Sequence, residues 1–210
     1  MAKNIGAYSE MGKNKRDFWH EDLRYATTMG DRIVLWLDNT HAWFDIAEGF
    51  HDSAQATVHT YLKNPDGKVD PVPAIGFLYR HSIELLLKSI VIVQKRADRE
   101  PEKFLVSHDL EHLWKEAIVA VDKIFPGETT MEERDRLGTC IARLSQWDPD
   151  ATYFRYPSLR QTTCSRESSQ TRPELRELIW ICERLHRWLR RVCEGMRDAS
   201  DMQEECPQDP

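Results

Sequence analysis

The sequence predicts an all-α protein folded as an up-and-down bundle of four to six helices. Apolar residues recur three or four positions apart through several long segments, which is the spacing that places them on one face of a helix. Polar segments that contain proline and glycine separate these stretches, and no run of alternating apolar and polar residues indicates a strand. Helices with apolar faces and short polar connections bury those faces against one another.

The composition is typical of one globular domain. The chain has 210 residues, of which 40% are hydrophobic and 30% are charged, so a core can form without disulfide or metal support. We expect a flexible arm over residues 1–15, a single helical-bundle domain over residues 16–197 and an acidic disordered tail over residues 198–210. The net charge of −6 gives no general affinity for nucleic acid, so such binding would need a local basic patch.

The cysteines and the N-terminal segment indicate a cytoplasmic protein. The five cysteines are odd in number and none has C-x-x-C spacing, so neither a disulfide framework nor a zinc ribbon is expected. The N-terminal residues include no apolar stretch of the secretory type. The longest apolar run, residues 85–93, is too short to cross a bilayer and contains a lysine. We expect no membrane span and no cofactor.

Two helices are predicted before the central one. A short helix over residues 16–29 is followed by a long helix without proline over residues 32–62. Residues 64–67 (NPDG) combine strong turn formers and end the long helix. Pro71 and Pro73 predict an extended stretch after this turn.

The most strongly apolar helix is predicted over residues 74–97. Its apolar residues cover nearly two faces, so it belongs in the centre of the bundle. Ser107 or Asp109 is the expected N-cap of the next helix, which Pro126 and Gly127 end.

Capping boxes open the last two predicted helices. The first begins at Thr130 and its helix runs to about residue 147, where an Asp-Pro-Asp sequence ends it. The second begins at Thr171, after an irregular stretch over residues 151–170, and its helix runs to about residue 196. The inward positions of this last helix are Leu175, Leu178, Ile179, Cys182, Leu185 and Leu189.

The predicted central helix also carries charged residues. Arg80, Glu84 and Lys88 are four residues apart and His81 is three residues before Glu84, so all four can share one strip of the helix. One interpretation is a salt-bridged stripe in contact with solvent. The other is a polar cluster at a cleft, with Arg80, His81 and Glu84 as catalytic candidates and Lys88 as a binding residue.

A second candidate site lies at the start of the following helix. His108, Glu111 and His112 match H-x-x-E-H, the inverted zinc-protease signature, in which two histidines bind zinc and the glutamate is the general base. No clear third ligand follows. The alternative is that His108 or Asp109 caps the helix and His112 is solvated, and we predict no metal site, with His108 as a binding residue.

The irregular segment after the fourth helix contains an arginine between aromatic residues. Tyr153, Phe154 and Tyr156 are expected to pack on the bundle, and Arg155 to meet a carboxylate such as Glu84. Arg155 and Tyr156 are therefore candidate binding residues. The alternative is that this segment only closes the end of the bundle.

The last predicted helix has a basic face. Arg184 and Arg187 belong to a stripe that also contains Arg176 and Arg191, with Trp180 and Trp188 nearby. Arginines interleaved with aromatic residues can bind phosphates and stack on bases. Glutamates interrupt the stripe, so the alternative is a solvated face.

Three segments together resemble the HEPN (higher eukaryotes and prokaryotes nucleotide-binding) superfamily. They are GFLYRHSIELLLKSIV (residues 76–91), SHDLEHLW (residues 107–114) and YFRYP (residues 153–157). The resemblance implies a helical bundle, a homodimer, and either RNase activity in bacterial toxin–antitoxin or phage-defence systems or a role in binding nucleotides and partner proteins. RNase members carry an arginine and a later histidine with four to six residues between them. No arginine of this chain has a histidine at that spacing, since Arg16 and His20 have only three residues between them.

Three functions follow from these patterns. The first is a HEPN-like binding module without catalytic activity, whose ligand is a partner protein, a nucleotide or RNA. The second is a metal-independent RNase in which Arg80 stabilises the phosphorane and His81 moves the proton across a dimer. The third is a zinc hydrolase that uses His108, Glu111 and His112.

Overall fold

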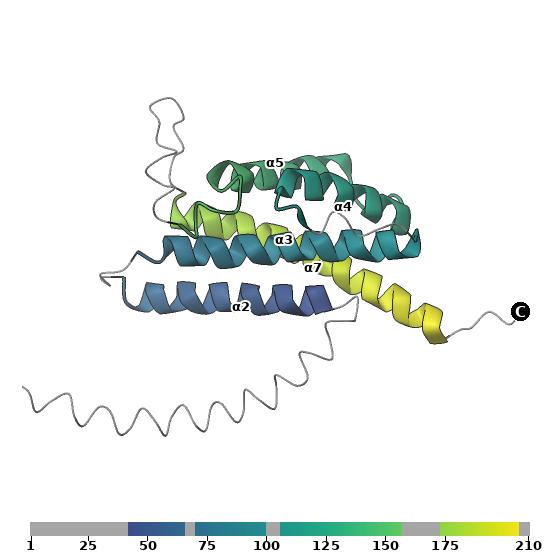
Figure 1. Cartoon of the computed structure of the whole chain (residues 1–210), viewed down its shortest axis with the longest axis horizontal. Helices are drawn as coiled ribbons and strands as arrows, with labels where there is room; N and C mark the ends of the chain where they lie inside the picture. Colours follow the sequence, from purple (N-terminus) through teal and green to yellow (C-terminus); the bar gives the residue numbers. More distant parts are fainter. Residues whose placement is uncertain (1–41, 66–69, 100–105, 157–172, 206–210) are drawn as a thin grey trace, which may run out of the picture. The chain divides into compact units, whose positions relative to one another are not determined.

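The computed structural model describes residues 42–65, 70–99, 106–156 and 173–205. Over these residues the chain forms helices and no strands, which confirms the all-α prediction. The helices are α2 (Ala42–Lys63), α3 (Val72–Ala97), α4 (Leu110–Ile124), α5 (Met131–Trp147) and α7 (Leu175–Glu205) (Figure 1). The predicted arm (residues 1–15), the predicted helix over residues 16–29 and the beginning of the predicted helix over residues 32–62 lie outside the described residues.

Helix α3 is the centre of the bundle, as its apolar composition predicts. Every residue from Ser82 to Ile92 is buried. In Figure 1, α2 lies along one side of α3, and α4 and α5 lie along the other. The most extensive contacts of α3 are with α7 and α4. None of the described helices combines the length and the apolar character needed to cross a membrane.

The prolines at the start of α3 begin the helix instead of extending the chain. The helix starts at Val72, so Pro73 is in its first turn. The N–H groups of that turn have no partner within the helix, so a proline there loses no hydrogen bond and its φ angle already suits the helix. The Asp70 side chain accepts a hydrogen bond from the Val72 N–H at 3.1 Å. The prediction that Pro71 and Pro73 keep this stretch extended is therefore wrong for both, because Pro71, the N-cap, also has helical dihedral angles (φ −83°, ψ −13°).

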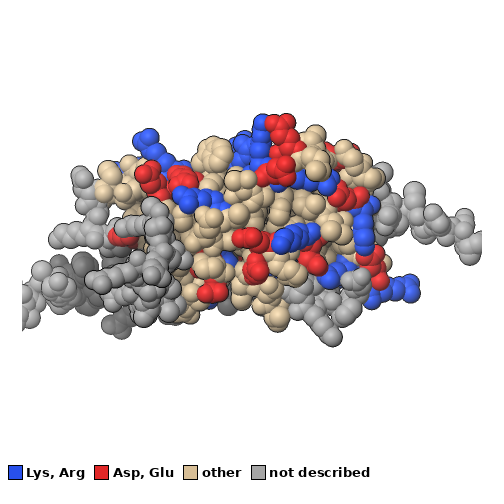
Figure 2. All heavy atoms as spheres, turned by 90° about the horizontal axis from the view of Figure 1, so that it is seen from above, with Lys and Arg blue, Asp and Glu red and all other residues tan. Residues whose placement is uncertain are grey.

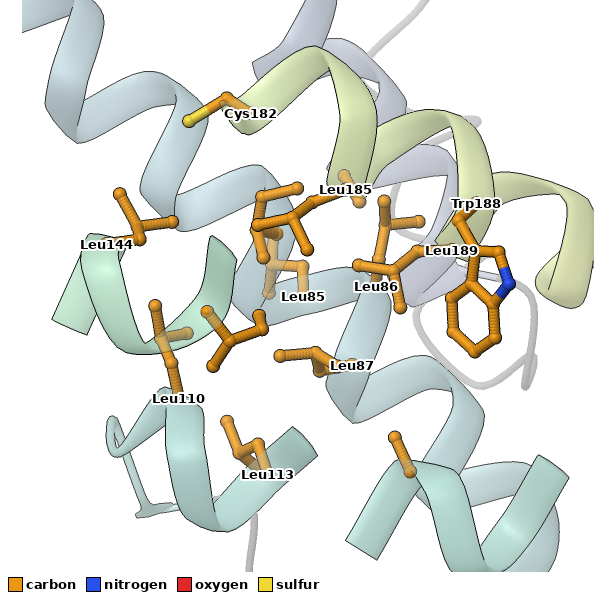
Figure 3. Packing of buried hydrophobic residues seen from close by; sticks show 14 of the residues in the cluster. Leu85, Leu86, Leu87, Leu110, Leu113, Leu144, Cys182, Leu185, Trp188 and Leu189 are labelled. Atoms are coloured by element: carbon orange, nitrogen blue, oxygen red, sulfur yellow. The ribbon is translucent and has the colours of Figure 1, made fainter. Parts of the chain in front are cut away.

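Leucines of α3 fill the space between α4, α5 and α7 (Figure 3). Leu86 and Leu87 are completely buried, and Leu85 is nearly so. Burial of one such side chain contributes about 1.5–3 kcal/mol, so apolar packing is the main source of stability. The residues around these leucines are Leu110, Leu113, Leu144, Leu185, Trp188 and Leu189.

The caps of α4 and α5 lie where local sequence patterns place them. Asp109 is the N-cap of α4, and its side chain accepts hydrogen bonds from the N–H groups of Glu111 at 2.9 Å and His112 at 3.1 Å. Thr130 caps α5 through the N–H of Glu133 at 3.2 Å. Gly127, between the two helices, has a φ of +81°, a conformation that costs glycine little.

Helix α7 buries the predicted apolar face but is longer than predicted. Leu178, Cys182, Leu185 and Leu189 are completely buried. The helix continues to Glu205 and does not end near residue 196. Acidic composition alone does not end a helix, because glutamate and glutamine are good helix formers.

The segment after α5 docks on α3 through one aromatic ring. Phe154 is buried, and its ring lies against the backbone of Gly76. A Cβ atom at Gly76 would lie 2.6 Å from the Phe154 ring, so only glycine leaves room for this contact. Tyr153 also packs on the core, as expected, whereas Tyr156 is exposed, so the prediction that it packs on the bundle is wrong.

Candidate functional site

Four of the sequence-predicted residues meet at one buried carboxylate. Helix α3 places Arg80, Glu84 and Lys88 on successive turns, and the loop before α4 adds His108. Arg80 Nη1 lies 2.9 Å from Glu84 Oε2, while Lys88 Nζ and His108 Nδ1 each lie 2.8 Å from Glu84 Oε1. We call these four residues, together with Asp148, the Glu84 cluster.

Arg80 connects three parts of the chain within the Glu84 cluster. Its Nη2 donates to the His108 carbonyl oxygen at 2.8 Å, and its Nε donates to the Asp148 carbonyl oxygen at 3.1 Å. One Asp148 carboxylate oxygen accepts from the Tyr153 N–H at 2.8 Å, and the other lies 3.5 Å from Arg80 Nε. The arginine therefore ties the start of α4 and the end of α5 to α3. The sequence predicted only that a helix ends at Asp148. Its contact with Arg80 could not be predicted from local patterns, because the two residues are 68 positions apart in the chain.

The Glu84 cluster is buried except at His108, whose side chain is 55% exposed. The exposed fractions are 2% for Arg80, 1% for Glu84 and 3% for Lys88, so the interpretation as a solvent-exposed stripe is wrong. Burial opposes ionisation of Glu84, but the hydrogen bond and charge of Lys88, together with His108 and Arg80, hold the pKa of Glu84 below its usual range. Each buried charge has a partner, as burial requires. The cluster therefore joins the helices through buried ion pairs, and His108 is the member that reaches the surface.

His81 does not join the Glu84 cluster. Successive helical residues point about 100° apart, so His81 and Arg80 face different neighbours. The His81 ring stacks on Phe77 at 5.7 Å and meets the edge of Phe50 at 4.5 Å. Burial lowers the pKa of His81. Arg80 therefore belongs to the ionic Glu84 cluster, whereas His81 packs against the rings of Phe50 and Phe77.

The H-x-x-E-H residues do not converge on a metal site. His108 uses Nδ1 to contact Glu84, while Glu111 and His112 are exposed in the first turn of α4. No group of three or more histidine, cysteine, aspartate or glutamate side chains among the described residues could hold a metal ion. Asp109 caps the helix, in agreement with the alternative interpretation of this motif.

Arg155 does not meet Glu84. Its Nε donates to the Ala151 carbonyl oxygen, and its guanidinium lies 5.3 Å from the centre of the exposed Tyr156 ring. The expectation that Arg155 pairs with Glu84 is therefore wrong. Residues Ala151 and Phe154 are buried, so this segment closes the bundle by apolar packing, and Arg155 and Tyr156 remain on the surface.

A groove with an arginine-rich lining lies between α5 and α7. It has a volume of about 600 Å³, which is within the range of about 300–1,000 Å³ found for small-ligand sites. We call it the α5/α7 groove. Its lining residues are Arg136, Thr139, Cys140, Arg143, Glu177, Trp180, Ile181 and Arg184.

Trp180 and Arg184 are the aromatic and basic residues that α7 contributes to the α5/α7 groove. The exposed fraction of Trp180 is 58%, which is unusual for so large an apolar side chain. The Arg184 guanidinium lies 5.4 Å from the centre of the Trp180 ring. Within the described part of the chain, Arg184 makes this aromatic contact and no ion pair. Its charge is therefore available to an anion.

The α5 side of the groove supplies two further arginines. Arg143 Nε lies 3.0 Å from Glu177 Oε1, and the Arg143 guanidinium lies 5.0 Å from the centre of the Trp147 ring. Arg136 pairs with Glu132. Figure 2 looks onto the side of the bundle that carries α4 and α5, where basic and acidic side chains are interspersed. The groove is thus a local basic site on a surface of mixed charge.

The basic face predicted on the last helix is divided by the fold. Trp180 and Arg184 line the groove, whereas Arg187 is exposed outside its lining. Trp188 is buried and packs on Trp114 with ring centres 5.5 Å apart, so it is unavailable to a ligand. Sequence patterns did not identify Arg136 and Arg143, because they are on another helix.

Comparisons of this chain with protein-family models, with curated proteins and with solved structures gave no match. The geometry described above therefore carries the functional argument.

Proposed function

We propose that this chain is a HEPN-like binding module without catalytic activity, and that the α5/α7 groove binds the base and phosphate of single-stranded RNA or a nucleotide. One observation carries the proposal: an exposed tryptophan lies beside an arginine that has no ion pair within the described residues, in a groove large enough for a nucleotide.

Two neighbouring side chains of the groove match the two parts of a nucleotide. A nucleobase can stack on Trp180, and stacking of this kind contributes about 1–3 kcal/mol for each base. Arg184 can contact the phosphate, because a guanidinium binds phosphate oxygens through two parallel hydrogen bonds. Arg143 is near enough to the same groove to add positive charge once Glu177 is displaced.

The burial of Arg80 and Glu84 supports a role without catalysis. Arg80 and Glu84 would be the charged catalytic candidates, but both are buried and already bonded within the protein. His81, which would transfer the proton, packs against phenylalanine rings instead. The missing arginine–histidine spacing of the HEPN resemblance agrees with this view.

The test is binding of a fluorescently labelled single-stranded RNA, measured by anisotropy at several salt concentrations. Trp180→Ala should weaken binding about tenfold or more. Arg184→Gln should weaken it too and should lower the slope of log affinity against log salt by about 0.7, the value for one lost phosphate contact. Competition with a mononucleotide distinguishes a nucleotide site from an RNA site.

Arg187→Gln is the matched control, because it removes the same charge from an exposed position outside the groove lining. It should leave binding within about twofold of the wild type. Equal losses for Arg184→Gln and Arg187→Gln would show general attraction to basic residues and would contradict the groove assignment. Absence of RNA and nucleotide binding, or cleavage of the RNA that His81→Ala abolishes, would contradict the proposed function itself.

The homodimer that the HEPN resemblance implies is part of the same proposal. Light scattering coupled to size-exclusion chromatography measures the mass in solution directly. A mass near twice 24.7 kDa supports the homodimer, and a mass near the single-chain value contradicts it.

A further inference from the structure

Two buried histidines are stacked face to face between α2 and α7. The rings of His51 and His186 have centres 3.4 Å apart and planes 6° apart. Their exposed fractions are 6% and 4%. The pair lies on a different part of the bundle from the Glu84 cluster and the α5/α7 groove, with which it shares no residue.

Each histidine of the pair faces a glutamate on the opposite helix. His186 of α7 contacts Glu48 of α2, with Nε2 and Oε1 2.7 Å apart. His51 of α2 faces Glu183 of α7, with Nε2 and Oε1 3.2 Å apart. The second contact lacks hydrogen-bond geometry, so His51 Nε2 is a buried nitrogen without a hydrogen-bond partner. The two crossed contacts join α2 to α7.

Both glutamates have further partners. Glu48 Oε2 lies 3.2 Å from Arg190 Nη1. Glu183 Oε1 accepts hydrogen bonds from Tyr79 Oη at 2.7 Å and from Gln55 Nε2 at 3.1 Å. Titratable and charged groups from three helices face the ring pair. They are Glu48 and Asp52 of α2, Tyr79 of α3, and Glu183 and Arg190 of α7.

We propose that His51 and His186 form a pH-sensitive latch that holds α2 on α7 while the rings are neutral and releases α2 when both are protonated. One imidazolium can be balanced by the neighbouring carboxylates. A second would place two cations face to face at 3.4 Å. The carboxylates cannot balance it fully, because Arg190 already neutralises part of the charge on Glu48 and Tyr79 and Gln55 already bind Glu183.

The direction of the pH effect follows from the electrostatics of His186. Burial, and then the charge of His51, lower the pKa of His186 below its ordinary value of 6.5. A histidine whose pKa is lower in the folded state stabilises the fold above the ordinary value and destabilises it as the pH falls below that value. The latch should therefore be closed at neutral pH and should open under mild acid.

The test is amide hydrogen exchange of the full chain at about pH 7.5 and about pH 5.5, with exchange times corrected for the pH dependence of the chemical rate. Protection of α2 should fall about tenfold more than protection of α3 at the lower pH. Unchanged protection of α2 would overturn the proposal. So would an equal loss in α2 and α3, because that result indicates unfolding of the whole bundle.

Two variants separate the latch from other effects of acid. His51→Phe keeps a ring stacked on His186 and removes one of the two imidazoles, so a second cation can no longer form beside His186. Helix α2 should then lose less than about twofold of its protection at the lower pH. His186→Phe tests the same point from the other helix, with Glu48 still paired to Arg190. His59→Gln, at an exposed position of α2, is the control and should respond as the wild type does. If α2 lost as much amide protection at the lower pH in both phenylalanine variants as in the wild type, the proposal would be overturned.

Discussion

Replacement of Glu84 by glutamine should destabilise the protein strongly, because it removes the one negative charge that Arg80 and Lys88 share. Both cations are buried, and both contact this carboxylate at 2.8–2.9 Å. Removal of one partner from a buried ion pair costs about 3–5 kcal/mol. Glutamine keeps the shape and one acceptor oxygen, so we expect a loss near the lower figure, about 3 kcal/mol. For a chain of this length that corresponds to a fall in Tm of about 6–12 °C.

A second substitution tests whether unpaired charge is the cause. Within the described residues, Lys88 pairs with Glu84, and Lys88→Met replaces the buried ammonium with an apolar side chain of similar length. The double variant Glu84→Gln/Lys88→Met should therefore be about 1–2 kcal/mol more stable than Glu84→Gln alone. If Glu84→Gln destabilised the protein through lost side-chain packing, the double variant should be less stable than Glu84→Gln alone, because it alters more of the core.

Thermal and urea unfolding followed by far-ultraviolet circular dichroism measures these differences. Glu132→Gln is the matched control, since Glu132 also pairs with an arginine four residues away but is exposed. It should change the free energy of unfolding by less than about 0.5 kcal/mol. If Glu84→Gln also lost less than about 1 kcal/mol, the carboxylate would not be balancing buried cations and the reasoning would be refuted.

Three further outcomes are expected. Because the pKa of Glu84 is lowered in the folded protein, its contribution should be present above the ordinary glutamate value of 4.5 and lost as the pH falls further, so wild type and Glu84→Gln should converge in stability on acidification. Gly76→Ala should lower stability by about 1–3 kcal/mol through the clash with Phe154, and unchanged urea unfolding would show that the ring moves aside freely. Asp109→Ala should cost about 1 kcal/mol by removing the α4 cap, whereas Asp109→Asn should restore most of it.

Local patterns predicted most of the helices and their caps. Asp109 and Thr130 bond to N–H groups two or three residues away, so the information that selects these caps is contained in a few neighbouring residues. The apolar surface of α3 likewise predicted its central place, because a helix that is apolar on most sides must be covered. The later end of α7, at Glu205, was missed because an acidic segment can be either helix or coil.

Composition and spacing therefore determined that this chain forms a helical bundle around α3, and they identified Arg80, Glu84, Lys88 and His108 as polar residues of interest. The packing of helices distant in sequence decided what those residues do. It buried Arg80, Glu84 and Lys88 beside Asp148, brought Arg136 and Arg143 into one groove with Trp180, and stacked His51 on His186. Helical periodicity specifies which face a side chain is on, but the partner it meets depends on how that face packs against another helix.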